Sequence, residues 1–291
     1  MSEHEGRVDA PLPRSHLYVP GNAGTRLDKA WASAADAVVV DLEDGVPVAE
    51  KPTARLAVVD WLAATTVERV GSSRELWIRV NAGAEGLVDL DALAGAAGVT
   101  GLVPAKATIA DLRTLSTELD RRTLDWRLSP LLETPGAVLD ARVVAGLPRV
   151  LRLHIGEYDL CAATGVQPGP DEAELAWARS WVVFASSEAG LDPPVAPVST
   201  EVRDLAALTA STARAARQGF VGRACIHPAQ LPVVHGVFTP SDEAVARARA
   251  LLEGHDAALA AGSGAYLDQD GRMVDEAVAR SARRTVALAR T

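Results

Sequence analysis

The sequence predicts a TIM barrel, an α/β fold of eight parallel strands alternating with helices, followed by a C-terminal helical extension. Short runs rich in Val, Ile and Leu recur along the chain, and a longer segment with helical periodicity follows each. The runs are nearly continuous rather than alternating, which is typical of parallel strands buried on both faces. Eight such alternations favour a barrel over a doubly wound sheet. No Gly-x-Gly-x-x-Gly follows the first run, which also disfavours the open sheet.

The predicted strands, in chain order, are residues 15–19, 37–41, 76–80, 99–103, 127–132, 150–156, 194–198 and 220–227. The seventh has the weakest strand pattern, because three prolines interrupt it. Helical periodicity between the strands predicts helices at residues 24–35, 52–67, 108–120, 171–189 and 200–218.

The chain continues well past the eighth run. Ser241 is a good N-cap for a helix over residues 242–261, and a last helix is expected near residues 274–289. The Gly-Ser-Gly turn between them fits either a mobile flap or a packed helical extension. We therefore expect one domain, with the barrel over residues 14–236 and the extension over residues 237–291.

Composition excludes several classes of protein. The 291 residues include 29 Lys and Arg against 38 Asp and Glu, a net charge of −9, which disfavours nucleic acid as a partner. Two cysteines without a Cys-x-x-Cys spacing exclude a disulfide framework. Residues 1–13 lack the apolar core of a signal peptide, and no apolar run is long enough to span a membrane. We expect a cytoplasmic protein without membrane or nucleic-acid partners.

Acidic residues gather where the predicted strands end, which is where a TIM barrel carries its catalytic groups. Glu43 and Asp44 follow the second run, Glu133 the fifth and Asp159 the sixth. Burying these carboxylates is costly unless a cation neutralises them, and Mg²⁺ prefers such oxygen ligands. Because Glu133 and Asp159 follow adjacent strands, we predict that they share one Mg²⁺. The alternative for any single acid is a helix cap or a surface ion pair.

Basic residues near the same rim suggest an anionic substrate. Arg79 is predicted to face the barrel interior and to bind an anionic substrate or a developing oxyanion, which is compatible with a salt bridge to Glu43 or Asp44. Arg14, Arg26 and Lys29 either hold phosphates or are simply solvated. Lys106 is the one lysine at a strand end, and a Schiff-base role is left open.

Eight segments in order resemble the citrate lyase β-subunit-like family, which includes malyl-CoA and citramalyl-CoA lyases. They are RSHLYVPG at 14–21, DLEDGV at 41–46, RVN at 79–81, LET at 132–134, GEYDL at 156–160, GFVGRACIHPAQ at 219–230, FTPS at 238–241 and DGRMVD at 270–275. The resemblance covers residues 14 to about 289. It implies a TIM barrel with Mg²⁺ on Glu133 and Asp159, and Glu43 and Asp44 supporting the water shell of the metal.

The resemblance also implies the reaction, a reversible cleavage of a 3-hydroxyacyl-CoA to an acyl-CoA and a 2-oxo acid. Mg²⁺ would chelate the oxo acid, and Arg79 would stabilise the thioester enolate. Arg14, Arg26, Lys29 and Asn81 are assigned to binding substrate or CoA. Asp275 matches a proton-transfer residue that covers the active site of a neighbouring subunit, which implies a homo-oligomer, either a trimer or a hexamer.

The chain departs from the family pattern in three places: Pro104-Ala105, Pro193 to Pro197, and Arg223, where a lysine is expected. We expect these positions to shape the rim of the substrate pocket. Two other functions stay open at this point. One is an aldolase acting on free 2-oxo acids without CoA. The other is a subunit that acts on, or only binds, an acyl carrier protein.

Overall fold

A computed structural model describes residues 12–289. Residues 1–11 lie outside the described part. They include most of residues 1–13, the N-terminal segment in which no signal peptide is expected. Nine parallel strands form one sheet in the order β5-β4-β3-β2-β1-β9-β8-β7-β6. Their bounds are β1 Ser15–Pro20, β2 Ala37–Asp41, β3 Glu75–Val80, β4 Gly101–Pro104, β5 Arg127–Leu128, β6 Leu131–Leu132, β7 His154–Ile155, β8 Val195–Ala196 and β9 Gly222–Cys225.

The two ends of this sheet are joined through a single stretch of chain. β5 pairs with β4 and β6 pairs with β7, yet only Ser129 and Pro130 separate β5 from β6. The amide of Ser129 donates to the carbonyl of Leu102 on one side, and the carbonyl of Pro130 accepts from His154 on the other. The predicted fifth run therefore closes the sheet, which confirms the TIM-barrel prediction. The regular strands at the sixth and seventh runs are shorter than predicted, with two residues each.

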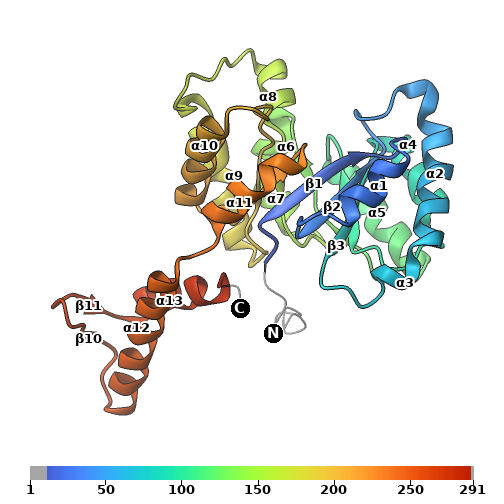
Figure 1. Ribbon diagram of the computed structural model, residues 1–291. Helices are drawn as coiled ribbons and strands as arrows, with labels where there is room; N and C mark the ends of the chain where they lie inside the picture. The colour runs from blue at the N-terminus through green and yellow to red at the C-terminus, as the bar shows by residue number, and fades with distance from the viewer. Residues whose placement is uncertain (1–11, 290–291) are drawn as a thin grey trace. The chain divides into compact units, whose positions relative to one another are not determined.

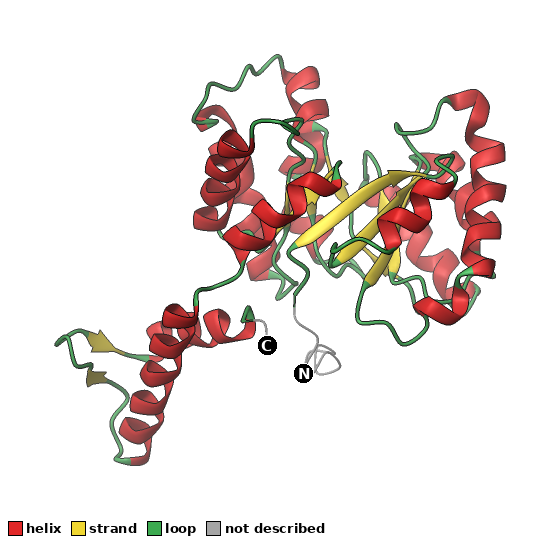
Figure 2. Ribbon diagram, viewed as in Figure 1, coloured by secondary structure: helices red, strands yellow, loops and turns green. Residues whose placement is uncertain are grey.

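Helices surround the strands (Figures 1 and 2). In the barrel they are α1 Thr25–Trp31, α2 Lys51–Ala64, α3 Thr66–Arg69, α4 Gly83–Leu93, α5 Ile109–Arg121, α6 Pro135–Leu139, α7 Ala141–Ala145, α8 Glu157–Thr164, α9 Ala176–Glu188, α10 Leu205–Gln218 and α11 Leu231–Phe238, with short 3₁₀ turns η1 Val48–Glu50, η2 Ala173–Leu175 and η3 Pro228–Gln230. The structure adds helices that the sequence pattern did not predict, namely α4, α6, α7, α8 and α11.

Strand side chains are buried on both faces of the sheet, as continuous apolar runs predict. Inside the barrel, Val39, Trp77, Val103 and Leu131 pack into one cluster. Val38 and Val40 on β2 point the other way and are also fully buried. Because Asp41 pairs in register with Arg79, the polar residues at the strand ends come together at one end of the barrel.

By its contacts the chain divides into two units, and residues 13–235 form the barrel unit. The second unit contains the chain from Gly236 onward. Its helices are α12 Asp242–Ala260 and α13 Glu276–Ala287, and a two-stranded antiparallel sheet, β10 Tyr266–Leu267 and β11 Met273–Val274, lies between them in sequence. Ser241 caps α12, its hydroxyl accepting from the Ala244 amide at 3.2 Å. No helix within residues 12–289 has the length and apolarity to cross a membrane.

Candidate active site

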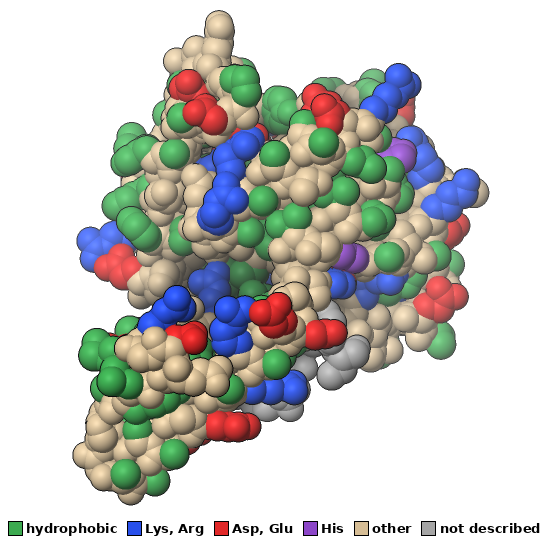
Figure 3. Space-filling model, turned by 60° about the vertical axis from the view of Figure 1, so that its left-hand side comes forward, with side chains coloured by type: hydrophobic (Ala, Val, Ile, Leu, Met, Phe, Trp, Pro, Cys, Tyr) green, Lys and Arg blue, Asp and Glu red, His purple; other side chains and the backbone are tan. Residues whose placement is uncertain are grey.

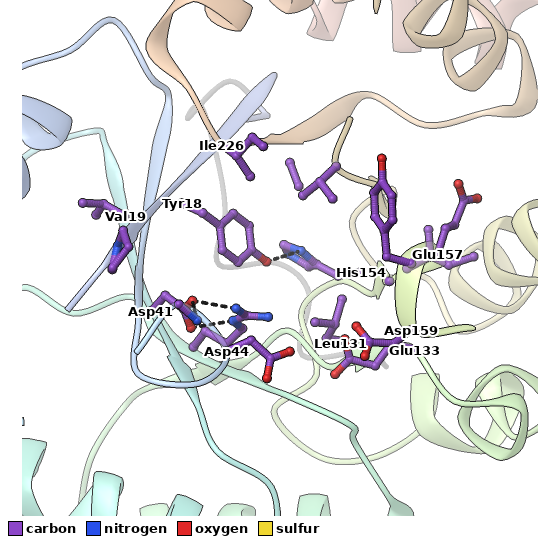
Figure 4. A pocket seen from close by; sticks show the side chains of 18 of the residues that line it. Tyr18, Val19, Asp41, Asp44, Leu131, Glu133, His154, Glu157, Asp159 and Ile226 are labelled. Carbon is purple, nitrogen blue, oxygen red and sulfur yellow. Dashed lines mark hydrogen bonds and ion pairs between the residues drawn. The ribbon is translucent and has the colours of Figure 1, made fainter. Parts of the chain in front are cut away.

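A cavity of about 450 Å³ opens at the carboxyl ends of the barrel strands. Tyr18 on β1, Arg79 on β3, His154 on β7 and the residues that follow β2, β6 and β7 line it (Figure 4). Arg26 and Asp41 also line it, and its other walls are apolar or backbone, from residues such as Leu131, Ile155, Gly156, Val198, Ala224 and Ile226. This end of a parallel barrel is the one at which TIM-barrel enzymes place their active sites.

Glu133 and Asp159 lie next to each other on the cavity wall (Figure 4). Glu133 directly follows β6 and is 2% exposed, while Asp159 stands in the first turn of α8, just after β7. Gly156 makes room for the Glu133 side chain, because a Cβ at that glycine would lie 2.5 Å from the Glu133 Cβ. The Lys106 amide donates to Glu133 Oε1 at 2.6 Å, which fixes the carboxyl group.

The charge environment of Glu133 is consistent with a side chain that binds a cation. Burial raises its pKa to about 7; the Lys106 amide opposes this shift, and the neighbouring Asp159 carboxylate adds to it. Mg²⁺ prefers carboxylate oxygens as ligands, and two carboxylates face this cavity. The raised pKa of Glu133 means that its negative charge is disfavoured when no cation is bound. Within residues 12–289 no group of three His, Cys, Asp or Glu side chains is arranged for a metal.

Mg²⁺ binding should release protons below neutral pH. A pKa near 7 means that Glu133 is mostly protonated at pH 6 in the metal-free protein, so an ion must displace that proton. We expect the Kd for Mg²⁺ to fall about tenfold per pH unit up to pH ~7 and to level off above it. Titration calorimetry in two buffers of different ionisation enthalpy measures both the Kd and the protons released; a Kd independent of pH from 5.5 to 8.5 would contradict this assignment.

Arg79 also lines the cavity, where two carboxylates hold its guanidinium in place. Its Nε and Nη2 donate to the two carboxylate oxygens of Asp41, each at 2.6 Å, and Nη1 lies 3.1 Å from Glu43 Oε2. Its guanidinium also lies over the Tyr18 ring, 5.5 Å from the centroid. The hydrogen bonds to Asp41 outweigh the effect of burial and raise the pKa of Arg79, so it stays charged at all relevant pH values.

Asp41 organises the loop that follows β2. Besides Arg79, its carboxylate accepts from the amides of Glu43 at 2.9 Å and Gly45 at 2.8 Å. A Cβ at Gly45 would lie 2.3 Å from Asp41 Oδ2, so this position requires glycine. The predicted site did not include Asp41. Like Glu133, however, Asp41 is an acidic residue at the end of a predicted strand.

Lys106 bridges the two acidic residues expected to support the metal. Its Nζ bonds to Glu43 Oε1 and lies 3.6 Å from Asp44 Oδ2. Its backbone adopts a left-handed φ of 47°, which is costly for lysine and which accompanies the amide contact to Glu133. Glu43 is buried and does not line the cavity, whereas Asp44 lines it (Figure 4). Bonding between Nζ and carboxylates favours a charged amine over a Schiff-base nucleophile.

The other predicted cations do not converge on this site. Arg26, exposed on α1, lines the cavity, but Lys29 on the same helix does not. Arg14 precedes β1 and so lies at the opposite end of the barrel, where its guanidinium makes two bonds to Asp36 at 2.8 and 3.0 Å. That position does not fit the substrate-binding role expected for Arg14.

Asn81 also lies outside the cavity. Its amide donates to the Leu42 carbonyl at 2.9 Å and to Asp89 Oδ2 at 2.8 Å, and its oxygen accepts from Lys51. It lines a separate cavity of about 210 Å³ together with Pro104 and Ala105. Asn81 therefore ties the β3 end to α4 and does not line the main cavity, which does not fit the substrate-binding role expected for it.

Arg223 was also expected on the pocket rim, and its side chain lies elsewhere. It is buried on β9, where Nη1 donates to the hydroxyls of Ser211 at 3.0 Å and Thr212 at 3.1 Å on α10. The lysine-to-arginine departure therefore alters the packing of a helix on the barrel rather than the cavity wall.

Asp275 belongs to the second unit and caps α13. Its Oδ1 accepts from the amides of Ala277 at 3.0 Å and Val278 at 3.1 Å. The side chain is partly exposed, and within residues 12–289 these bonds use only one of its two carboxylate oxygens.

Sequence reasoning missed two cavity residues on the strands themselves, Tyr18 and His154. Their hydroxyl and ring nitrogen lie 3.3 Å apart across the barrel (Figure 4). Tyr18 stands one residue before the end of the first strand run, and His154 stands two residues before the end of the sixth. A polar aromatic residue close to the end of an apolar run was a usable signal.

The fold and the rim together define a class: an α/β barrel with paired acidic residues and a clamped arginine at the carboxyl ends of its strands. The family model of HpcH/HpaI aldolase/citrate lyase matches residues 14–228. The chain belongs to this family, which confirms the resemblance drawn from its motifs. Named relatives include lyases.

Among curated proteins, the citrate lyase subunit beta-like protein of Deinococcus radiodurans is 34% identical over 95% of this chain and 98% of its own length. A (3S)-malyl-CoA thioesterase of Cereibacter sphaeroides is 32% identical over 95% of this chain and 94% of its own. The L-malyl-CoA/beta-methylmalyl-CoA lyase of that species is 30% identical over 95% of both chains.

Among solved structures, CitE of Mycobacterium tuberculosis in complex with magnesium, acetoacetate and coenzyme A aligns with a TM-score of 0.78 at 31% identity. It covers 96% of this chain and 98% of its own. RipC of Yersinia pestis aligns with a TM-score of 0.66 at 28% identity, covering 81% of this chain and 99% of its own. The alignment with CitE extends over both units of the present chain.

Proposed function

We propose that this protein is a Mg²⁺-dependent carbon–carbon lyase that cleaves, or forms, a 3-hydroxyacyl-CoA such as malyl-CoA or citramalyl-CoA. The products of cleavage are an acyl-CoA and a 2-oxo acid. The observation that carries the proposal is the pair Glu133 and Asp159, side by side on a cavity that also holds a charged arginine. Relatives named as malyl-CoA lyase and citrate lyase beta-like protein support the reaction class.

Glu133 and Asp159 are the residues that would hold the magnesium ion. The structurally similar CitE was solved in complex with magnesium, which supports this choice of metal. When bound, the ion supplies Lewis-acid polarisation of the oxo acid and a template for its orientation. The protein prepares this position by fixing Glu133 through the Lys106 amide. Glu43 and Asp44 bind Lys106, and Asp44 also reaches the cavity, where it can hold water.

Arg79 would stabilise the negative charge that develops on the thioester enolate as the carbon–carbon bond breaks. Its charge is permanent, and Asp41 and Glu43 hold the guanidinium in one position before substrate arrives. Such preorganised charge contributes to catalysis because no reorganisation is needed during the reaction. Arg26, at the cavity edge on an exposed helix, is the cation that we assign to the CoA phosphates.

Asp275 would transfer the proton to or from the acyl carbon of the thioester. We propose that it does so at the active site of a neighbouring subunit in a trimer or hexamer. The free carboxylate oxygen of this cap residue supports the role. The alignment of CitE, solved with coenzyme A, over nearly the whole chain favours CoA thioesters over free oxo acids as substrates.

The reaction is tested by a mass-spectrometric screen of acyl-CoA esters against pyruvate, glyoxylate and oxaloacetate, with and without Mg²⁺. We expect Mg²⁺-dependent formation of a 3-hydroxyacyl-CoA adduct from one pair. Release of free CoA without loss of the carbon–carbon bond would indicate a thioesterase, the activity named for one relative. No change in any ester would contradict the proposal.

Replacing Asp275 by asparagine should remove proton transfer while keeping the helix cap, since asparagine caps as well as aspartate. We expect kcat to fall by roughly 10²-fold or more, with little change in KM. The same substitution at Asp204, which caps α10 through the Ala207 amide at 2.9 Å, is the matched control and should leave kcat unchanged.

Co-expression of the Asp275→Asn and Glu133→Gln chains tests whether Asp275 acts across subunits. If it does, mixed oligomers contain sites with both native residues and recover roughly a quarter of wild-type activity. If mixed oligomers form but stay inactive, Asp275 acts within its own chain or not at all.

A further inference from the structure

The two carboxylates assigned to magnesium are held in different ways. Glu133 is fixed directly, because its Oε1 accepts from the Lys106 amide at 2.6 Å. Within residues 12–289 the Asp159 carboxylate accepts no hydrogen bond and takes part in no ion pair. Asp159 lies in the first turn of α8, so its place beside Glu133 depends on what fixes that turn.

Helix α8 has little of its own to fix its first turn. It has eight residues, and its N-cap, Gly156, supplies no side-chain hydrogen bond. Helices of this length are marginal alone and depend on tertiary contacts. Glu157 and Leu160 are its buried residues, whereas Tyr158, whose hydroxyl bonds to Thr200 Oγ1 at 2.8 Å, is exposed. Glu157 is therefore the buried polar anchor of this turn.

A buried arginine on α9 holds Glu157. Arg179 Nε donates to Glu157 Oε1 at 2.5 Å, and Nη2 donates to Oε2 at 2.7 Å. The Arg179 side chain is 2% exposed and that of Glu157 10%. Burial lowers the pKa of Arg179, but its hydrogen bonds to Glu157 and Glu172 outweigh burial and raise it, so the guanidinium stays charged. Two parallel charge-assisted bonds fix the orientation of a carboxylate as well as its position.

Arg179 is itself braced by residues outside α8. Its Nη1 donates to Glu172 Oε2 at 2.7 Å, and Glu172 Oε1 accepts from the Ser211 hydroxyl on α10 at 2.8 Å. The Ser211 hydroxyl also accepts from Arg223, at the position where the family pattern has lysine. The guanidinium is therefore tied to the segment before α9 and through it to α10, and it gives α8 a fixed point.

Glu157 and Asp159 lie on different sides of the first turn of α8. Residues two apart in a helix do not face each other, and Figure 4 shows the Glu157 carboxyl group directed away from that of Asp159. We propose that Arg179 is a positioning residue for the magnesium site: it holds Glu157 on the α9 side of the turn and thereby keeps Asp159 on the cavity side. This inference rests on the proposed function, because it assigns Asp159 to the metal.

The affinity for Mg²⁺ alone, measured by titration calorimetry, tests the inference. Arg179→Lys keeps the positive charge but cannot form the two parallel bonds. We expect the Kd for Mg²⁺ to rise about tenfold, as is typical when a residue that orients a metal ligand is changed. A rise of less than about threefold in the folded variant would overturn the proposal.

A second variant of unchanged charge keeps the test decisive if Arg179→Lys does not fold. Glu157→Asp shortens the reach by one carbon, so both bonds to Arg179 cannot form with α8 in place, and we expect a similar rise in Kd. Arg179→Met adds a test by sign, since loss of a cation beside the site favours Mg²⁺ on charge alone. Tighter binding of Mg²⁺ by Arg179→Met would show that charge dominates, and it would overturn the proposal.

The matched control is a second buried arginine–glutamate pair. Arg152 is 2% exposed and donates to both oxygens of Glu75, at 2.6 and 3.0 Å. Glu75 begins β3, so this pair lies toward the end of the barrel opposite the cavity. Arg152→Lys should lower stability and leave the Kd for Mg²⁺ unchanged. An equal rise in Kd would show a general loosening of the barrel and would overturn the proposal.

Kinetics with saturating Mg²⁺ gives a further readout. Arg179 does not line the cavity among the described residues, so kcat of Arg179→Lys should return to within about threefold of the wild type once Mg²⁺ is saturating. A kcat that stays low would overturn a role that acts only through the metal site.

Failure of this inference can be told apart from failure of the proposed function. If Asp159→Asn abolishes Mg²⁺ binding and Arg179→Lys leaves it unchanged, the positioning role is wrong and the metal site stands. If Arg179→Lys weakens Mg²⁺ binding but no acyl-CoA reacts, the positioning role stands and the CoA chemistry is wrong. If neither variant changes Mg²⁺ binding, the metal assignment and the positioning role are both wrong.

Discussion

Glu133→Gln should abolish Mg²⁺-dependent turnover while leaving the barrel folded. The amide keeps the shape of the side chain, and its oxygen can still accept from the Lys106 amide. It is a much weaker magnesium ligand than a carboxylate, so we expect kcat/KM to fall by roughly 10³-fold or more. Because burial already disfavours the charge on Glu133, stability should be unchanged or slightly higher. Steady-state kinetics and urea unfolding measure the two effects.

The partner carboxylate should respond in the same way. Asp159→Asn is expected to lose Mg²⁺-dependent turnover to a similar extent, whereas the surface variant Glu188→Gln, which loses only an exposed ion pair with Arg142, should keep wild-type activity. Wild-type turnover in either the Glu133 or the Asp159 variant would remove the magnesium assignment.

Arg79→Met should cost both activity and stability. The substitution leaves the carboxylates of Asp41 and Glu43 buried without their cation, although Lys106 still bonds to Glu43. Removing one partner of a buried pair typically costs about 3–5 kcal/mol in the free energy of unfolding. Loss of the charge that stabilises the enolate should lower kcat by roughly 10²–10³-fold.

A double variant separates the two effects of Arg79. In Arg79→Met combined with Asp41→Asn, one uncompensated charge is removed, but one of the two loop amides that bond to Asp41 loses its acceptor, so only part of the stability should return while kcat stays low. If kcat recovered together with stability, Arg79 would be a structural residue, and the enolate would need another cation.

The sequence was sufficient for the barrel because its strands are continuous apolar runs, a pattern that burial on both faces requires. It also placed Glu133 and Asp159 on neighbouring strands, since parallel strands carry their ends to the same rim. The sequence did not reveal that the sheet closes through Ser129 and Pro130. A run of apolar residues does not show at which residue the strand stops pairing with β4 and starts pairing with β7.

Side-chain partners were the part that the sequence did not reveal. Arg14 and Arg79 are both arginines near predicted strands, yet one binds Asp36 at the far end of the barrel and the other binds Asp41 in the cavity. The difference is whether the residue precedes or ends its strand. Asn81 directly follows a strand too, but its side-chain amide donates to Asp89. Asp89 lies on α4, a helix that the sequence pattern did not predict.

Acidic and basic side chains are both present on the face seen in Figure 3, although the net charge of the chain is −9. Global charge carries little information about the cavity, where Arg79 and Arg26 stand among carboxylates. Local arrangement rather than net charge decides what the site binds.

The most direct test of the account is a crystal structure of the protein soaked with Mg²⁺ and a 2-oxo acid. The account predicts one ion about 2.1 Å from an oxygen of Glu133 and an oxygen of Asp159, with water or the oxo acid at the other positions. An ion bound elsewhere, or the two carboxylates turned away from each other around an empty cavity, would contradict it.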